Sequence, residues 1–228
     1  MIEMRRLTVE NSDRKTMRHE RRRQFFIKAA QELMKEGDES KLTAKSIAER
    51  AGYSASSLYD YFESLDKLLV MSVDEFMAEI GDMTEVEIEK CDRVTDCVEA
   101  AYLIFAEYFL DNPLLFRTIF LAPGSSRAKF FSNPELMPKF CEMGMKRLES
   151  LRQFDESLGL KKGSSLIIEQ ILTPEMFGIL FMYFQGLYEV SKEEAIQMLK
   201  RNIDHVLEPF RELEEKTISS KERLGGKK

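Results

Sequence analysis

The chain has 228 residues, of which 43% are hydrophobic and 32% are charged, and its formal net charge is −6. This composition is typical of one large globular domain or two small ones, and it excludes an intrinsically disordered chain. The first ten residues lack the apolar stretch of a secretory signal, and the three cysteines contain no Cys-x-x-Cys motif, which argues against a zinc site. We therefore expect a cytoplasmic protein with no metal and no cofactor.

The charge is unevenly distributed along the chain. Residues 1–70 have a balance of +2, and the remaining residues have a balance of −8. A basic cluster opposed only by Glu20 consists of Arg14, Lys15, Arg18, Arg21, Arg22, Arg23 and Lys28. Such a cluster is either the solvated face of a helix or a surface that meets a polyanion.

In chain order, the hydrophobic pattern predicts helices throughout, without the alternation of a strand or the signal of a hairpin. We expect residues 1–13 to be a flexible arm. Residues 15–35 are predicted to form the first helix, with Phe26, Ala30 and Leu33 on its apolar face.

Three small polar residues divide the next segment. Thr43, Ser54 and Ser64 each precede an apolar run and are favourable N-cap residues. Each begins a predicted helix, and these helices cover residues 44–51, 55–61 and 65–80. Gly52 supplies the turn between the first two. With the first helix, they are expected to form a domain over residues 14–80.

Residues 81–218 are predicted to form a second helical domain, followed by a flexible tail at 219–228. Its helices are expected at residues 94–110, 114–121, 135–158, 174–190 and 192–215. Pro174 suits a first helical turn, and Ser191 opens a capping box with the glutamate three residues on. Pro209 is expected to kink the last helix or to end it early.

The segment from Thr43 to Phe62 carries the sharpest functional signal, and it reads TAKSIAERAGYSASSLYDYF. A short helix, a glycine turn and a second short helix form the helix-turn-helix pattern. Ala55, Ser56 and Ser57 are small, so the start of the second short helix can enter a DNA major groove about 12 Å wide. The alternative is a small three-helix packing that binds no DNA.

The run IAERAGYSASSLYDYF, followed by SLDKLL, resembles the DNA-binding domain of the TetR family of one-component transcriptional repressors. The resemblance is specific over about residues 22–69 and architectural over the rest. It implies an all-α fold, in which an N-terminal three-helix bundle with a helix-turn-helix precedes a helical ligand-binding and dimerisation domain. It also implies a homodimer that binds an inverted-repeat operator in double-stranded DNA and is released by a small-molecule inducer.

The helix-turn-helix and the residue pattern together give a set of expected DNA contacts. These are Thr43, Lys45, Ser54, Ala55, Ser56, Ser57, Tyr59, Tyr61 and Lys67. The resemblance places residues 55–57 in the groove and the two tyrosines at phosphates. The sequence departs from the family at Tyr53, where a small aliphatic residue is usual, and at Leu65, where a lysine is common. Lys67 is then expected to supply the missing phosphate contact.

Large apolar residues are frequent in the second domain, and the whole chain has 16 Phe and 13 Met. They form either an ordinary core or an apolar cavity with adaptable walls, because Met repacks easily. The second interpretation predicts a hydrophobic inducer that contacts Phe105, Tyr108, Phe109, Phe120, Phe140, Met143, Phe177 and Phe181. Glu107 and Arg117 either pair with a ligand charge, form salt bridges or face solvent.

Dimerisation is expected through the last two predicted helices. Apolar residues recur there at helical spacing, at Leu180, Tyr183, Leu187, Ile203, Val206 and Phe210. No nucleophile–base pair, phosphate-binding loop or metal-ligand spacing favours an enzyme, and no segment is long and apolar enough to suggest a membrane partner. The alternative that remains is an all-helical protein–protein adaptor without DNA binding.

Overall fold

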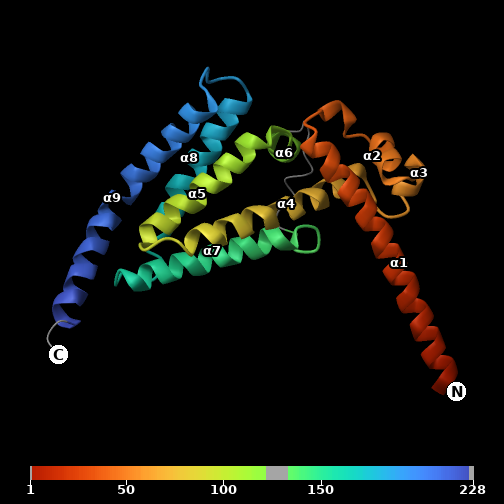
Figure 1. Ribbon diagram of the computed structural model, residues 1–228, viewed down its shortest axis with the longest axis horizontal. Helices are drawn as coiled ribbons and strands as arrows, with labels where there is room; N and C mark the ends of the chain where they lie inside the picture. Colours follow the sequence, from red (N-terminus) through yellow and green to blue (C-terminus); the bar gives the residue numbers. More distant parts are fainter. Residues whose placement is uncertain (1, 122–132, 226–228) are drawn as a thin grey trace. The chain divides into compact units, whose positions relative to one another are not determined.

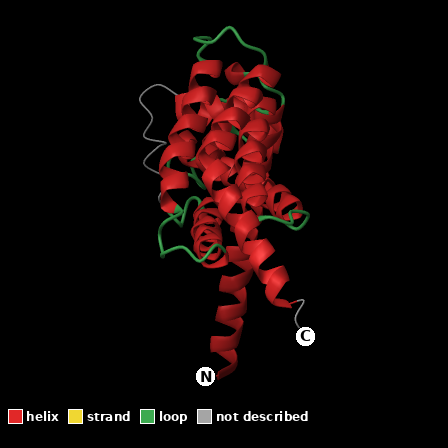
Figure 2. Cartoon of the chain, turned by 90° about the vertical axis from the view of Figure 1, so that its left-hand side faces the viewer, coloured by secondary structure: helices red, strands yellow, loops and turns green. Residues whose placement is uncertain are grey.

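The computed structural model describes residues 2–121 and 133–225, and these are helical with no strand among them (Figures 1 and 2). A single 3-10 turn covers Glu39–Lys41, and a π-helical turn covers Arg117–Leu121. The α-helices in the described ranges are α1 (Ile2–Lys35), α2 (Ala44–Ala51), α3 (Ala55–Leu58), α4 (Leu65–Ile88), α5 (Val94–Asp111), α6 (Pro113–Phe116), α7 (Pro138–Ser157), α8 (Leu166–Phe184) and α9 (Lys192–Gly225). The all-α fold expected from the sequence is confirmed.

The chain divides into two compact units. The first consists of residues 1–76 and 114–138, and the second of residues 77–113 and 139–228. Helix α4 supplies its first half to one unit and its second half to the other. This helix was expected to end at about residue 80, but it continues through Gly81 because a glycine costs a helix interior only about 1 kcal/mol.

The core of the first unit forms where α1 packs on α2, and α2 on α3. Phe26, Ala30 and Leu33 of α1 are buried, as their spacing predicted. Ile47 of α2 and Leu58 of α3 are both fully buried against this stripe. The start of the domain thus follows directly from the hydrophobic pattern.

Two helix ends differ from the sequence expectation. Helix α1 begins at Ile2 rather than near residue 15, because residues 1–13 contain no glycine or proline that would stop a helix. The flexibility expected of that segment stays a prediction. Helix α9 continues past Glu215 to Gly225, and Pro209 does not end it. The carbonyl that loses its partner belongs to exposed His205, where water can replace the missing N–H.

Helix α8 also begins earlier than predicted. It starts at Leu166, so Pro174 lies in its interior and not in its first turn. The carbonyl opposite the proline is that of exposed Gln170, which is open to water. The predicted capping box at Ser191 is confirmed: its N–H donates to Glu194 Oε2 at 2.7 Å, and the Glu194 N–H donates to Ser191 Oγ at 3.2 Å.

In the second unit, α5, α8 and α9 pack against one another (Figure 1). Ile168 and Leu172 of α8 and Leu207 of α9 are fully buried in this core. Leu180 and Ile203, which the sequence analysis assigned to a dimer interface, are buried inside the unit as well. Helical spacing alone could not tell these inward-facing residues from those that face a partner.

A carboxylate from α9 caps the amino end of α5. The N-cap residue Arg93 makes no side-chain hydrogen bond there. Instead, Glu214 accepts hydrogen bonds from Val94 N at 2.7 Å, Thr95 N at 3.4 Å and Thr95 Oγ1 at 2.6 Å. Glu214 is only 5% exposed, so these bonds offset the cost of burying its charge and fasten α9 to α5.

Replacing Glu214 by alanine should lower the free energy of unfolding by about 2–4 kcal/mol, because two N–H groups and a hydroxyl lose a charged acceptor. Urea unfolding of the full chain measures this loss. Glu215→Ala is the matched control, because Glu215 only forms an exposed ion pair with Arg93. Equal effects of the two substitutions would contradict the capping role.

Candidate functional site

The turn between α2 and α3 has the local structure that its residues predict. The Thr43 hydroxyl caps α2 by accepting a hydrogen bond from Ser46 N at 3.1 Å. Gly52 follows α2 with φ of 81°, a left-handed conformation that favours glycine. The Tyr53 N–H then donates to Ala48 O at 2.8 Å, which closes the end of α2.

Helix α3 is a single turn that begins at a serine cap. Ser54 Oγ accepts from Ser57 N at 3.3 Å, and the Ser56 and Ser57 hydroxyls each lie 2.9 Å from the same Ser54 oxygen. Ser54 and Ser56 are exposed, whereas Ala55 and Ser57 are half-buried. The start of α3 therefore presents only hydroxyls and a methyl group to solvent, in a preformed arrangement.

Buried side chains hold this turn in place. Leu58 is 0% exposed, and Phe62 packs edge-on against Phe26, with ring centroids 6.2 Å apart. Tyr53 also packs on Phe26, at 5.1 Å, which accounts for an aromatic residue where the family usually has an aliphatic one. Helix α3 was expected to reach Tyr61 but ends at Leu58, because the following N–H groups bond three residues back rather than four.

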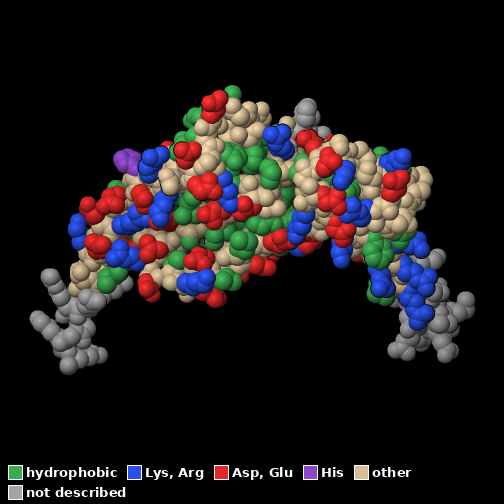
Figure 3. All heavy atoms as spheres, turned by 45° about the horizontal axis from the view of Figure 1, so that its top comes forward, with side chains coloured by type: hydrophobic (Ala, Val, Ile, Leu, Met, Phe, Trp, Pro, Cys, Tyr) green, Lys and Arg blue, Asp and Glu red, His purple; other side chains and the backbone are tan. Residues whose placement is uncertain are grey.

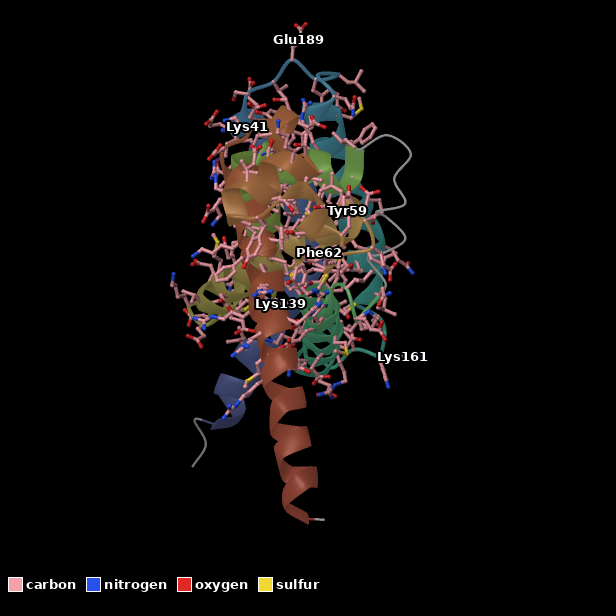
Figure 4. The ribbon with its side chains drawn as sticks, turned by 90° about the vertical axis from the view of Figure 1, so that its right-hand side faces the viewer. Lys41, Tyr59, Phe62, Lys139, Lys161 and Glu189 are labelled. Carbon is pink, nitrogen blue, oxygen red and sulfur yellow. The ribbon has the colours of Figure 1, made fainter. Side chains whose placement is uncertain are left out.

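The two tyrosines predicted to contact phosphate differ in their surroundings. Tyr59 is 56% exposed, and Figure 4 labels it beside the buried Phe62. The Tyr61 hydroxyl accepts a hydrogen bond from Arg22 Nη1 at 3.5 Å, and its ring lies 4.6 Å from that of His19. The hydrogen bond to Tyr61 raises the pKa of Arg22, which is fully exposed and stays charged. Tyr61 is thereby linked to the basic face of α1.

The basic cluster lies along α1, where Figure 3 shows Lys and Arg side chains gathered. Arg14, Arg18, Arg21 and Arg22 are all exposed. They stand at spacings of three and four residues, which places most of them on one side of the helix. This surface is available to an anionic partner.

The two lysines among the predicted DNA contacts are both near glutamates. Lys45 is largely exposed, with its Nζ 4.0 Å from Glu49. Lys67 Nζ lies 2.6 Å from Glu63 and is less exposed. Lys67 would have to exchange this partner for a phosphate, so its role as a substitute for a lysine at position 65 stays a prediction.

The residues predicted to bind a ligand lie at several places. Phe105, Phe109 and Phe177 form one aromatic cluster in the second unit, with Phe105 centroids 4.9 Å from Phe109 and 5.9 Å from Phe177. Tyr108 donates its hydroxyl to Glu79 at 2.6 Å, and both burial and this carboxylate raise the pKa of Tyr108. Phe105, Tyr108 and Phe109 are buried in the core, and Phe177 packs against Phe105 from a half-buried position.

The other four belong to the Arg117–Leu121 turn, α7 and α8. Phe120 belongs to the first unit, where its ring lies 4.8 Å from Phe116. Phe140 and Met143 are half-buried on α7. Phe181 is 45% exposed on α8 and faces solvent in the single chain.

An open groove of about 880 Å³ lies instead between the second half of α4 and α5. Its apolar lining comes from Met83, Val86, Ala100, Leu103 and Ile104. Five carboxylate residues and one cysteine complete it, namely Asp82, Glu87, Asp96, Glu99, Glu107 and Cys91. None of the eight predicted ligand residues lines this groove, but Glu107, which the sequence analysis singled out, does.

The sequence contained a signal for this groove. Ala100, Leu103 and Ile104 follow one another at helical spacing on α5, with Asp96 before them and Glu107 after them. An apolar helix face bounded by carboxylates predicts a surface that holds an apolar group beside a positive charge. Glu99 is already paired with Arg211 and with Lys200, so it contributes less to such a site.

Comparison with known proteins connects the first unit to a family. The family model described as bacterial regulatory proteins, tetR family, matches residues 26–70. This match covers 45 of the 228 residues and relates the helix-turn-helix segment to that family. The resemblance expected over about residues 22–69 is thereby confirmed. No curated protein matches the sequence of this chain.

Solved structures of TetR-family regulators share the fold of both units. A TetR transcriptional regulator from Rhodococcus sp. RHA1 is 22% identical, with a TM-score of 0.51 over 82% of this chain and 96% of that protein. A TetR family transcription regulator from Marinobacter aquaeolei VT8 is 20% identical, with a TM-score of 0.52 over 82% of this chain and 97% of that protein. At these identities the likeness shows a common fold, in which a helix-turn-helix domain precedes a helical domain.

Gly52→Ala should destabilise the chain by about 1–2 kcal/mol, because the left-handed turn strains any residue with a Cβ. Crowding is not the cause, since no heavy atom of the described residues lies within 4 Å of the added carbon. Gly81→Ala in α4 is the control: it has the same free space but a helical backbone, and it should stabilise by about 0.5–1 kcal/mol. Urea unfolding curves distinguish the two variants. If Gly52→Ala unfolds at the same urea concentration as the unaltered chain, the turn is not left-handed.

Proposed function

We propose that the chain is a ligand-responsive transcriptional repressor that binds an inverted-repeat operator as a homodimer. The observation that carries the proposal is the start of α3, which is capped by Ser54, anchored by Leu58 and open to solvent at Ser56. A preformed helix start with small side chains fits a major groove and orders little on binding. We also propose that it acts in the cytoplasm, where a regulator of this kind meets its DNA.

The proposed DNA contacts around α3 fall into two groups, those that reach base edges and those that reach phosphates. Ala55, Ser56 and Ser57 can reach base edges and so determine which sequence is preferred. Tyr59 and Tyr61, with Thr43 at the start of α2, present hydroxyls suited to phosphates, which position the domain without reading sequence. The arginines on α1 add further phosphate contacts beside Tyr61, or enter a minor groove.

The outer face of α8 supports dimerisation through the last two helices. Ile167, Ile171 and Phe181 are 46%, 36% and 45% exposed, and they share a stripe with Pro174 and Gly178. In the described part of the chain, α8 is the only helix with the length and apolar composition to cross a membrane, and only 28% of that window is buried. A second copy of the chain would cover this stripe and give a two-fold contact.

We infer that the inducer combines an apolar body with a positive charge and occupies the groove between α4 and α5. The apolar lining at Val86 and Leu103 favours the body, and the carboxylates at Asp96 and Glu107 favour the charge. Helix α4 contributes to this groove and also to the DNA-binding unit. A ligand that prefers one α4 conformation would weaken operator binding by a typical coupling of about 1–3 kcal/mol, and DNA would weaken ligand binding equally.

The adaptor hypothesis remains a second candidate, because the exposed stripe on α8 also fits a protein partner. The salt dependence of binding distinguishes a DNA-binding dimer from a protein–protein adaptor. A dimer that neutralises several phosphates should lose DNA affinity steeply with salt, with a log–log slope of about −0.9 per phosphate.

Tyr59→Phe should weaken binding to a selected operator and to random DNA by the same factor, about 5-fold, because a phosphate contact carries no sequence information. Ser56→Ala should instead change the preferred sequence while leaving affinity for random DNA nearly unchanged. Fluorescence anisotropy with labelled duplexes measures both effects. Tyr188→Phe, which alters an exposed hydroxyl in the second unit, is the control and should change neither. An operator-only effect of Tyr59→Phe would refute the phosphate assignment.

Introducing a charge on the α8 stripe should dissociate the dimer. Ile171→Glu and Phe181→Glu each place a carboxylate where a second copy would bury an apolar side chain, so we expect monomers at micromolar concentration in analytical ultracentrifugation. Leu148→Glu is the control, since Leu148 is a 59% exposed leucine on α7, outside the α8 stripe. If both classes of variant sediment like the unaltered chain, α8 is not the interface.

A further inference from the structure

Two cysteine thiols meet at the turn between α4 and α5. Cys91 follows α4, and its Sγ donates to Glu87 O at 3.3 Å. Cys97 lies in the first turns of α5, and its Sγ donates to Ile88 O at 3.9 Å. The two acceptors are consecutive carbonyls at the end of α4, and helix carbonyls point along the same axis. Both sulfur atoms are therefore directed to one helix end.

The two side chains also interact with each other. Burial, followed by the charge and the hydrogen bond of Cys91, raises the pKa of Cys97 to about 12. Cys97 thus stays a protonated thiol near neutral pH. Both cysteines are half-buried, but of the two only Cys91 lines the open groove, where a small solute can reach it. The third cysteine, Cys141, lies on α7.

We propose that Cys91 and Cys97 form a redox modification site, at which a low-molecular-weight disulfide such as oxidised glutathione converts the two thiols into an intramolecular disulfide. The inference does not depend on DNA binding or on an inducer. It follows from the convergence of the two thiols and from the access that the groove gives to one of them.

The conversion takes two exchange steps. The Cys91 thiolate attacks one sulfur of oxidised glutathione, forms a mixed disulfide and releases one glutathione, which takes up a proton. Cys97 then loses its proton and attacks the Cys91 sulfur, and the second glutathione leaves. The two cysteines are oxidised by two electrons in total, and the glutathione disulfide is reduced to two thiols.

The order of the steps follows from the environment of each thiol. The half-buried Cys97 thiol is a poor first nucleophile because its raised pKa keeps it protonated. Once Cys91 carries glutathione it can no longer bear a negative charge, so one cause of the raised pKa of Cys97 is removed. Cys97 then acts as the resolving thiol.

The product would join the end of α4 to the start of α5 across residues 91–97. These two helices supply the lining of the groove, so the disulfide would stiffen one end of it. Through this disulfide, the redox state of the surrounding small-molecule thiols would therefore change the stiffness of one end of the groove.

The test exposes the folded full chain to oxidised glutathione, followed by alkylation with iodoacetamide in denaturant and intact mass spectrometry. We expect the chain to lose two hydrogen atoms and to keep one alkylatable cysteine of its three, identified by peptide mapping as Cys141. Dithiothreitol should restore all three thiols. Three alkylatable cysteines after exposure, or a disulfide between two chains, would overturn the proposal.

Single-residue variants distinguish the attacking thiol, Cys91, from the resolving thiol, Cys97. In Cys97→Ser, Cys91 should remain as a stable mixed disulfide, so the mass increases by one glutathionyl group. Cys141→Ser is the matched control and should still form the internal disulfide at the rate of the unaltered chain. Circular dichroism verifies that each variant is folded. If Cys141 is modified as fast as Cys91, or if Cys97→Ser fails to trap glutathione, the assignment is wrong.

Discussion

The DNA-binding geometry depends on the burial of one side chain, Leu58. Helix α3 is a single turn, and a turn of this length has no stability of its own. Leu58 is fully buried in the core of the first unit and fixes the end of the turn, while Ser54 caps its start. The exposed Ser56 and Tyr59 are held in place because this leucine anchors the turn to the core.

The sequence predicted those features that local chemistry determines. Thr43, Ser54 and Gly52 each act within a few residues of their own position, so the caps and the turn could be identified without the fold. The stripe on α1 is also a local pattern. The helix ends predicted near Gly81, Pro174 and Pro209 were wrong, because packing along long helices outweighs the preference of a single residue.

The groove proposed to bind a ligand was not predicted from the sequence, because a groove depends on how helices face one another. Phe105 and Phe109 were predicted to line a cavity; they are buried in the core, where Phe105 also contacts the half-buried Phe177. The groove is lined instead by smaller residues such as Ala100 and Val86, with carboxylates at its edge. Periodicity tells which residues share a face, but not which face is covered. The proposed dimer face of α8 illustrates the same limit, since Leu180 is core and Phe181 is exposed.

Helix α4 connects the proposed activities. It begins beside the DNA-binding turn, lines the groove in its second half and ends at the carbonyls that both thiols contact. An inducer in the groove and a disulfide at Cys91 would therefore act on the same stretch of one helix. Two chemically different signals could bias one equilibrium in this way without sharing a binding residue.

The most direct test attaches an iron-chelate cleavage reagent to Ser56→Cys, in a chain whose native cysteines are replaced by serine, bound to an operator selected from random duplexes. If the start of α3 enters the major groove of each half-site, strand cuts should fall in two groups related by the two-fold axis of the operator. Cuts spread evenly along the duplex, or no cuts while the chain remains bound, would contradict the account.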